Sequence, residues 1–224
     1  MKIVALLPMK GNSERVPNKN LKQFNGVPLY HIVMNVLLES KYIDTVIVNT
    51  DCDNIKQDIQ SNFPARVEVI NRPKEIIGDY VSMNKIIEHD ISVFSADLFV
   101  QTHSTNPLLK TESLDRAIRQ MIDFRKQGTY DSVFSVTKWQ TRLYDKNGKP
   151  YNHDPQKLLR TQDLEPLFEE NSNFYIFSKE SFVNSGGKRI GINPCMYEIN
   201  KIESSDIDEM EDFLISEALH KLGI

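Results

Sequence analysis

The sequence has few cysteines and no long apolar run. Cys52 and Cys195 are its only cysteines, and they lie far apart without metal-ligand spacing. Isolated thiols are typical of a reducing compartment, so we expect a cytoplasmic protein. No apolar stretch approaches the roughly 20 residues that cross a bilayer. Met1 leads straight into a strand-like run with no export signal, so we expect no membrane association.

The chain also lacks an excess of positive charge. Its 27 Lys and Arg residues face 31 Asp and Glu residues, which gives a net charge of −4. A general nucleic-acid binder presents a basic face, so we expect no nucleic-acid partner. The 40% hydrophobic and 26% charged composition is that of an ordinary globular protein. The length fits one domain spanning residues 1–224.

Strand-like and helix-like segments alternate along the chain. The expected strands are 3–7, 45–48, 67–70, 98–100 and 132–136, followed later by 174–177 and 196–199. The expected helices are 29–37, a stretch from about 54, 81–93, 114–122 and 208–222. This order predicts a three-layer α/β fold with a mostly parallel sheet. Ligands of such sheets bind beyond the C-terminal ends of the strands.

The alternation stops between residues 138 and 172. This polar segment holds a turn signal at Asp145–Gly148 and three prolines, and it is too long for a simple loop. We expect a protruding segment that docks on a partner chain. A flexible insertion is the alternative.

The loop from Lys10 to Asn20 carries the main functional signal. It follows the first strand and contains three cations, one glycine and several small polar residues. Nucleotidyl transfer requires neutralisation of a triphosphate while charge moves onto pyrophosphate. Free backbone N–H groups and Lys or Arg side chains provide this. The loop matches neither the P-loop nor the dinucleotide fingerprint. By composition alone, a solvated basic loop fits equally well.

This loop resembles the signature of the acylneuraminate cytidylyltransferases, whose relatives include the CMP-Kdo synthetases. The family pattern is Ala-Arg-Gly-Gly-Ser-Lys-x-x-Pro-x-Lys-Asn, and the matching residues are Gly11, Ser13, Pro17, Lys19 and Asn20. Lys10 replaces the arginine of the pattern, Asn12 its second glycine and Glu14 a lysine. The Glu14 change reverses a charge beside the phosphates.

Further segments resemble the family in the same order. They are Val48–Asp51, Arg72-Pro73 with Asp79 and Ser82, Phe99–Thr102, Arg160–Leu164 with Tyr175–Phe177, and Asp206–Asp208. The turn 101–107 departs from the family's Gln-Pro-Thr-Ser-Pro. Because that turn faces the acceptor in the family, the departure bears on which acceptor is used, and a sugar contact by His103 stays open.

The resemblance implies a Rossmann-like nucleotidyltransferase fold and transfer of CMP from CTP to a sialic-acid-like (nonulosonic) sugar acid, for surface glycan biosynthesis. It also implies a homodimer in which the segment 138–172 reaches the partner's site. The implied catalytic residues are Lys10, Arg15 and Lys19. The implied nucleotide-binding residues are Gly11, Asn12, Ser13, Asn20, Arg72, Asp79 and Ser82. The implied acceptor-binding residues are Gln101, Thr102, Ser104, Arg160, Gln162 and Tyr175, with Arg160 suited to a carboxylate.

Two Asp-x-Asp pairs compete as ligands of a divalent metal. Asp51 and Asp53 follow the second strand, whereas Asp206 and Asp208 precede the last helix. Asp is also a favoured N-cap residue, and we expect that role for Asp51 and Asp53. The resemblance favours Asp206 and Asp208 as ligands of Mg²⁺, which prefers oxygen ligands.

Three other functions stay open at this point. The first is a nucleotidyltransferase with a different acceptor, such as a Kdo-like acid, an alcohol phosphate or a phosphonate. The second is a glycosyltransferase that uses Asp51 and Asp53. The third is a non-catalytic nucleotide-binding relative, which the charge of Glu14 suggests.

Overall fold

A computed structural model describes all 224 residues. Its main sheet has seven strands in the order β5-β4-β1-β6-β8-β7-β9. These strands are β1 (Ile3–Leu6), β4 (Thr45–Thr50), β5 (Val67–Asn71), β6 (Leu98–Thr102), β7 (Ser132–Trp139), β8 (Leu167–Phe177) and β9 (Pro194–Glu198). A separate hairpin is formed by β2 (Gln23–Phe24) and β3 (Val27–Pro28).

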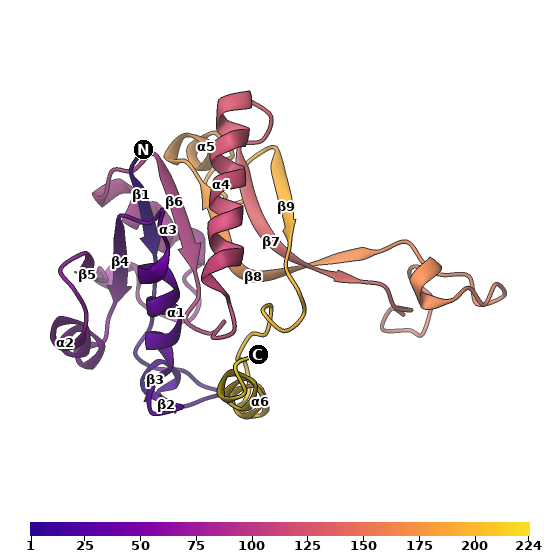
Figure 1. Cartoon of the computed structure of the whole chain (residues 1–224), viewed down its shortest axis with the longest axis horizontal. Helices are drawn as coiled ribbons and strands as arrows, with labels where there is room; N and C mark the ends of the chain where they lie inside the picture. The colour runs from indigo at the N-terminus through magenta and orange to yellow at the C-terminus, as the bar shows by residue number, and fades with distance from the viewer.

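Six α-helices and three short 3-10 helices complete the fold (Figure 1). The α-helices are α1 (Leu29–Glu39), α2 (Asp53–Asn62), α3 (Met83–Val93), α4 (Thr111–Gln127), α5 (Lys179–Asn184) and α6 (Met210–Lys221). The 3-10 helices are η1 (Lys19–Leu21), η2 (Lys74–Ile76) and η3 (Thr161–Asp163). No helix has both the length and the apolar character needed to cross a membrane.

The sheet is mostly parallel, which confirms the predicted fold class. β1 pairs in parallel with β4 and β6, and β4 with β5. β8 lies antiparallel between β6 and β7, whereas β9 pairs in parallel with β7. All four residues of β1 are buried because helices cover both faces of the sheet. One core packs α1, α2 and α4 against one face, and a second packs α3 and α5 against the other.

The last helix belongs to a third apolar cluster, at the end of the molecule that bears the β2–β3 hairpin. Phe24 and Leu29 pack there against Ile207 and Phe213. Asn25 adds hydrogen bonds to Glu217 on α6, at 2.8 Å to the side chain and 2.9 Å to the backbone carbonyl. This packing holds the segment before α6 beside the loop that follows β1.

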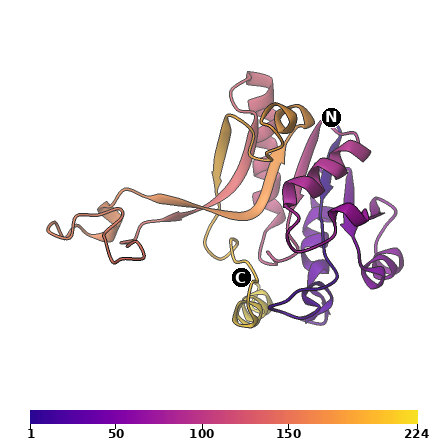
Figure 2. The same cartoon turned by 180° about the vertical axis from the view of Figure 1, so that it is seen from behind.

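The ribbon of β7 and β8 continues beyond the sheet and forms the base of an arm, residues 140–166, which extends away from the body (Figures 1 and 2). The inner part of β8 is buried, whereas Phe168, Glu169 and Glu170 are exposed. Exposed apolar side chains along the arm are Leu143, Tyr144, Tyr151, Leu158 and Leu159. β8 begins at Leu167, earlier than the expected 174, because its first residues pair with the outer end of β7.

Candidate active site

A polar cleft of about 440 Å³ lies at the C-terminal ends of β1 and β6. Its walls combine the loop after β1, the segment after β5 and the turn after β6. Among the residues predicted from the sequence, it gathers Lys10, Ser13, Arg15, Lys19, Asn20, Arg72, Asp79 and Ser104. The cleft lies at the edge of the sheet where ligands of parallel sheets bind.

The three loop cations are held by acidic groups or carbonyls from distant parts of the chain. Lys10 pairs with Asp79 at 2.7 Å. Arg15 pairs with Asp208 at 2.5 Å and with Glu209 at 3.2 Å. The ammonium group of Lys19 donates to the carbonyl of Ile207, and partial burial lowers the pKa of this lysine. The ion pairs of Lys10 and Arg15 are half exposed, so each is weak enough for an anionic ligand to replace the carboxylate.

Asp51 binds the loop and does not cap α2, which corrects our expectation. Its Oδ1 accepts a hydrogen bond from the backbone N–H of Gly11 at 2.8 Å. Cys52 occupies the N-cap position, and Asp53 pairs with Lys56 at 2.8 Å. A Cβ on Gly11 would lie 2.8 Å from the Cβ of Cys52, so only glycine fits there.

Asn20 joins the two sides of the cleft. Its amide nitrogen donates to the carbonyl of Lys10 at 2.9 Å, and its Oδ1 accepts from Ser104 at 2.6 Å. Arg72 lies on the wall of the cleft formed by the segment after β5. It donates to the carbonyls of Met9 at 3.0 Å and Asn49 at 2.9 Å, and to the side chain of Asn49 at 2.9 Å. These contacts give Asn20 and Arg72 positioning roles as well as a place on the cleft wall.

Asp206 and Asp208 lie beside the loop cations, outside the last helix. α6 begins at Met210 with Glu209 as N-cap, so neither aspartate caps it. Surrounding protein displaces water from the Asp206 carboxyl and raises its pKa, although the residue keeps exposed surface. The charge of Asp208 raises the pKa further. This surplus of negative charge fits a hard cation such as Mg²⁺, which takes one or two carboxylates together with phosphate oxygens. The chain has no cluster of three or more His, Cys, Asp or Glu residues arranged for a metal.

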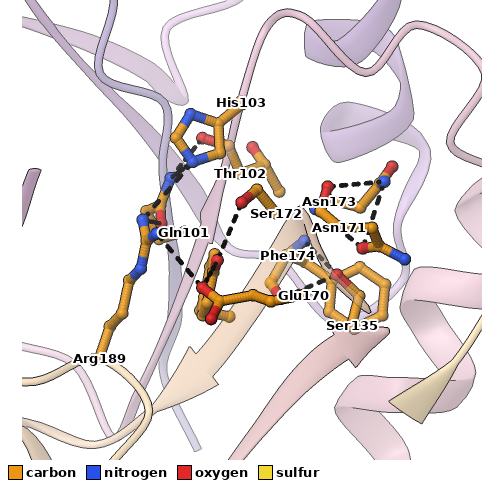
Figure 3. Close-up of polar contacts among 11 residues, drawn as sticks. Gln101, Thr102, His103, Ser135, Glu170, Asn171, Ser172, Asn173, Phe174 and Arg189 are labelled. Atoms are coloured by element: carbon orange, nitrogen blue, oxygen red, sulfur yellow. Dashed lines mark hydrogen bonds and ion pairs between the residues drawn. The ribbon is translucent and has the colours of Figure 1, made fainter. Parts of the chain in front are cut away.

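A buried polar network forms the wall behind the cleft (Figure 3). Gln101, Thr102 and Tyr175 are fully buried, so these predicted acceptor-binding residues lie behind the surface. Arg189 lies 3.6 Å from the centre of the Tyr175 ring and donates to Oε1 of Gln101 at 2.6 Å. The Tyr175 hydroxyl donates to Glu170. The sequence interpretation missed Arg189, which follows a Gly-Gly turn and carries no local signal of a site.

Other predicted residues lie outside the cleft lining. Gly11 and Asn12 belong to the loop, and the exposed Ser82 precedes α3 as its N-cap residue. Arg160 and Gln162 lie on the arm, where Arg160 pairs with Asp163 at 2.7 Å and keeps 73% of its side chain exposed. The arm extends away from the sheet and its helices (Figure 2).

Relatives in sequence share most of this chain. An N-acylneuraminate cytidylyltransferase from Oncorhynchus mykiss is 31% identical over 96% of the chain and 49% of the relative. A pseudaminic acid cytidylyltransferase from Campylobacter jejuni is 24% identical over 100% of the chain and 98% of the relative. The chain thus spans about half the length of the first of these relatives and nearly all of the second.

Solved structures share the fold. A CMP:2-keto-3-deoxy-manno-octonic acid synthetase complexed with CTP matches the whole chain with a TM-score of 0.75 at 14% identity and is itself covered completely. A family model described as cytidylyltransferase matches residues 4–220. That match includes the loop, the arm and both candidate metal ligands, and the chain belongs to the cytidylyltransferase family.

Proposed function

We propose that the protein transfers CMP from CTP to the anomeric hydroxyl of a nonulosonic sugar acid and releases pyrophosphate. The observation that carries the proposal is the cleft itself, where Lys10, Arg15 and Lys19 face one space at the end of β1. The named activities of the Oncorhynchus and Campylobacter relatives support the CTP donor and the acceptor class. The two free thiols favour the cytoplasm as the place of action.

In the proposed reaction, the oxygen of the anomeric hydroxyl bonds to the α-phosphorus as the bond to the oxygen bridging it to the β-phosphate breaks. Pyrophosphate leaves, and the hydroxyl proton passes to solvent. Lys10, Arg15 and Lys19 neutralise the charge that moves onto the leaving group. Arg15 exchanges its carboxylate partners for phosphate oxygens, which frees Asp208. Mg²⁺ held by Asp206 and Asp208 would neutralise triphosphate oxygens. Arg72 and Asn20 hold the loop in place through their contacts with backbone carbonyls.

The acceptor binds on the side of β6 and β8. Ser104 and the wall of Gln101 and Tyr175 lie there, next to the loop cations. We propose a homodimer in which the arm brings Arg160 to the partner's cleft. The exposed guanidinium of Arg160 and the apolar side chains along the arm support this arrangement.

A pyrophosphate-release assay tests the proposal. It combines CTP, ATP, GTP and UTP with a panel of nonulosonic acids, Kdo and alcohol phosphates in the presence of Mg²⁺. Release with CTP and a nonulosonic acid is the expected result. Release only with another acceptor would reassign the substrate, and CTP binding without turnover would indicate a non-catalytic protein. Consumption of a nucleotide sugar without pyrophosphate would indicate a glycosyltransferase.

A further inference from the structure

His103 stands at the boundary between the cleft and the buried network. It lines the cleft together with Ser104. Its Nε2 lies 3.1 Å from Nε2 of Gln101 and 3.5 Å from Nη1 of Arg189. Figure 3 shows this ring nitrogen turned towards Gln101 and Arg189, with the other nitrogen on the far side of the ring.

Two hydrogen-bond partners fix the orientation of the Gln101 amide, because one of them can only donate and the other can only accept. Arg189 can only donate, so the atom that it contacts at 2.6 Å must be the amide oxygen. The backbone carbonyl of Thr102 can only accept, so the atom at 2.8 Å from it must be the amide nitrogen. Gln101 therefore points an N–H group at His103.

This orientation determines the tautomer of His103. Both groups that face Nε2 are donors, so Nε2 must carry a lone pair and the ring proton must be on Nδ1. Burial and, to a smaller extent, the positive charge of Arg189 together lower the pKa of His103 to about 3, which keeps the ring neutral at physiological pH. Nδ1 has no hydrogen-bond partner within the chain. It is not one of the fully buried polar atoms that lack a partner, so it keeps some exposed surface.

We propose that His103 is an acceptor-binding residue whose Nδ1–H donates a hydrogen bond to an oxygen of the sugar acid, and that Gln101 and Arg189 are positioning residues that fix this tautomer. The position of the His103 ring in the cleft favours the sugar acid, and not CTP, as its ligand. His103 follows β6, which lies between β8 and β1, whereas Arg72 follows β5, two strands beyond β1. The identity of the ligand rests on the proposed function; the tautomer does not.

The arrangement excludes His103 as a general base. A base would need a free lone pair facing the substrate, but the lone pair of His103 faces Gln101. The site therefore selects an acceptor that offers an oxygen lone pair at this position, such as a carboxylate or a hydroxyl group, and disfavours one with a methyl group there.

Two substitutions of His103 test whether the Nδ1–H donor, and not the imidazole ring as a whole, binds the sugar acid. The side-chain amide of Asn ends near the position of Nδ1, whereas that of Gln reaches the position of Nε2. We expect His103→Gln to raise the KM for the sugar acid about tenfold, as for the loss of one hydrogen bond, with the KM for CTP unchanged. We expect His103→Asn to stay within about threefold of the wild type. Equal losses in both variants, or a change in the CTP KM instead, would overturn the donor role.

Nitrogen-15 NMR of the histidine side chains tests the tautomer without any turnover. The His103 signals, assigned by their absence in His103→Asn, should show a protonated Nδ1 at every pH between about 5.5 and 8.5. Gln101→Glu replaces the donor that faces Nε2 with an acceptor, so the proton should move to Nε2 in that variant. A protonated Nε2 in the wild type would overturn the proposal. Absence of pyrophosphate release with every acceptor, together with the expected tautomer, would reject the proposed function alone.

Discussion

Arg15 donates from Nη2 to Oδ1 of Asp208 at 2.5 Å, although the two residues lie 193 positions apart. The pair joins the loop after β1 to the segment before α6. Both groups also have a role in the proposed chemistry, Arg15 towards phosphate and Asp208 towards Mg²⁺. In the free protein the two charges neutralise each other, so the pair must open before Arg15 can bind phosphate and Asp208 can bind Mg²⁺.

Asp208→Asn should abolish Mg²⁺-dependent pyrophosphate release, with a fall of at least about a hundredfold in kcat. The amide keeps the shape of the carboxylate but loses its charge as a metal ligand. Because the pair with Arg15 is half exposed, the melting temperature should change little. The matched control is Glu209→Gln, which removes the other carboxylate beside Arg15 at 3.2 Å and should retain activity. Full activity of Asp208→Asn would rule out this metal ligand.

Lys19→Ala should raise the KM for CTP by about tenfold or more, because it removes a partly buried cation from the phosphate site. Steady-state kinetics with varied CTP measure the effect. Lys22→Ala is the control, since Lys22 lies near the Phe213 ring outside the cleft lining. Unchanged kinetics in Lys19→Ala would show that the loop charge has no role in binding.

Gly11→Ala should weaken CTP binding about tenfold, because the new Cβ meets the Cβ of Cys52 and pushes the loop outward. Cys52→Gly should bind CTP normally, since glycine is accepted at an N-cap. The double variant should recover most of the affinity, and that non-additivity identifies the contact. Calorimetric titration with CTP gives the three affinities. If the double variant lost as much CTP affinity as the two single variants together, the contact between the Cβ atoms of residues 11 and 52 would not be the cause.

The sequence was sufficient to predict a mostly parallel sheet and to mark the loop whose cations line one side of the cleft. The loop cations follow from a basic segment after a buried strand, because strand ends of a parallel sheet meet at one edge. The antiparallel direction of β8 was not predictable, since the apolar run Phe174–Phe177 has the same pattern in either direction. The contact between Arg189 and Gln101 joins residues 88 positions apart, and no local periodicity marks it. The expected caps at Asp51 and Asp53 were wrong because Gly11 and Lys56 bind those carboxylates instead.

Asp90→Asn should stabilise the protein increasingly as the pH rises. Asp90 is fully buried, its Oδ1 accepts from Asn49 at 2.6 Å, and its Oδ2 has no partner. Burial raises its pKa above the ordinary value, so the folded state holds the proton more tightly than the unfolded state. Stability is therefore lost as the pH rises from the unfolded to the folded pKa and does not return above it.

Urea unfolding at several pH values between about 4 and 8 measures this difference. The urea midpoints of the wild type and of Asp90→Asn should nearly coincide at the lowest pH. At higher pH they should separate, with Asp90→Asn more stable. Asp123→Asn is the control, since that carboxylate lies half exposed on α4 near Lys126 and should give no pH-dependent difference. A difference between the two midpoints that shrinks with rising pH would contradict the predicted direction of the effect.

At a CTP concentration well below the KM of Lys19→Ala, mixing two impaired variants should restore activity if the arm completes the partner's site. Arg160→Ala removes a guanidinium that is 73% exposed and pairs only within the arm, so it should leave folding intact and lower activity. Lys19→Ala lowers activity through the cleft. In a mixed dimer, the chain with Arg160→Ala supplies an intact cleft and its partner an intact arm. Each purified mixed dimer has one complete site of two, so we expect about half of wild-type activity.

The variants are mixed after reversible dissociation or are co-expressed with different tags, and the mixed dimer is purified before the assay. The control mixes Arg160→Ala with the double variant Lys19→Ala/Arg160→Ala, so neither arm of the mixed dimer carries Arg160 and no activity should be restored. If the arm acts on its own chain, no mixture will exceed the activity of its components. If the protein is a monomer at assay concentration, full activity of the wild type there would likewise exclude a shared site.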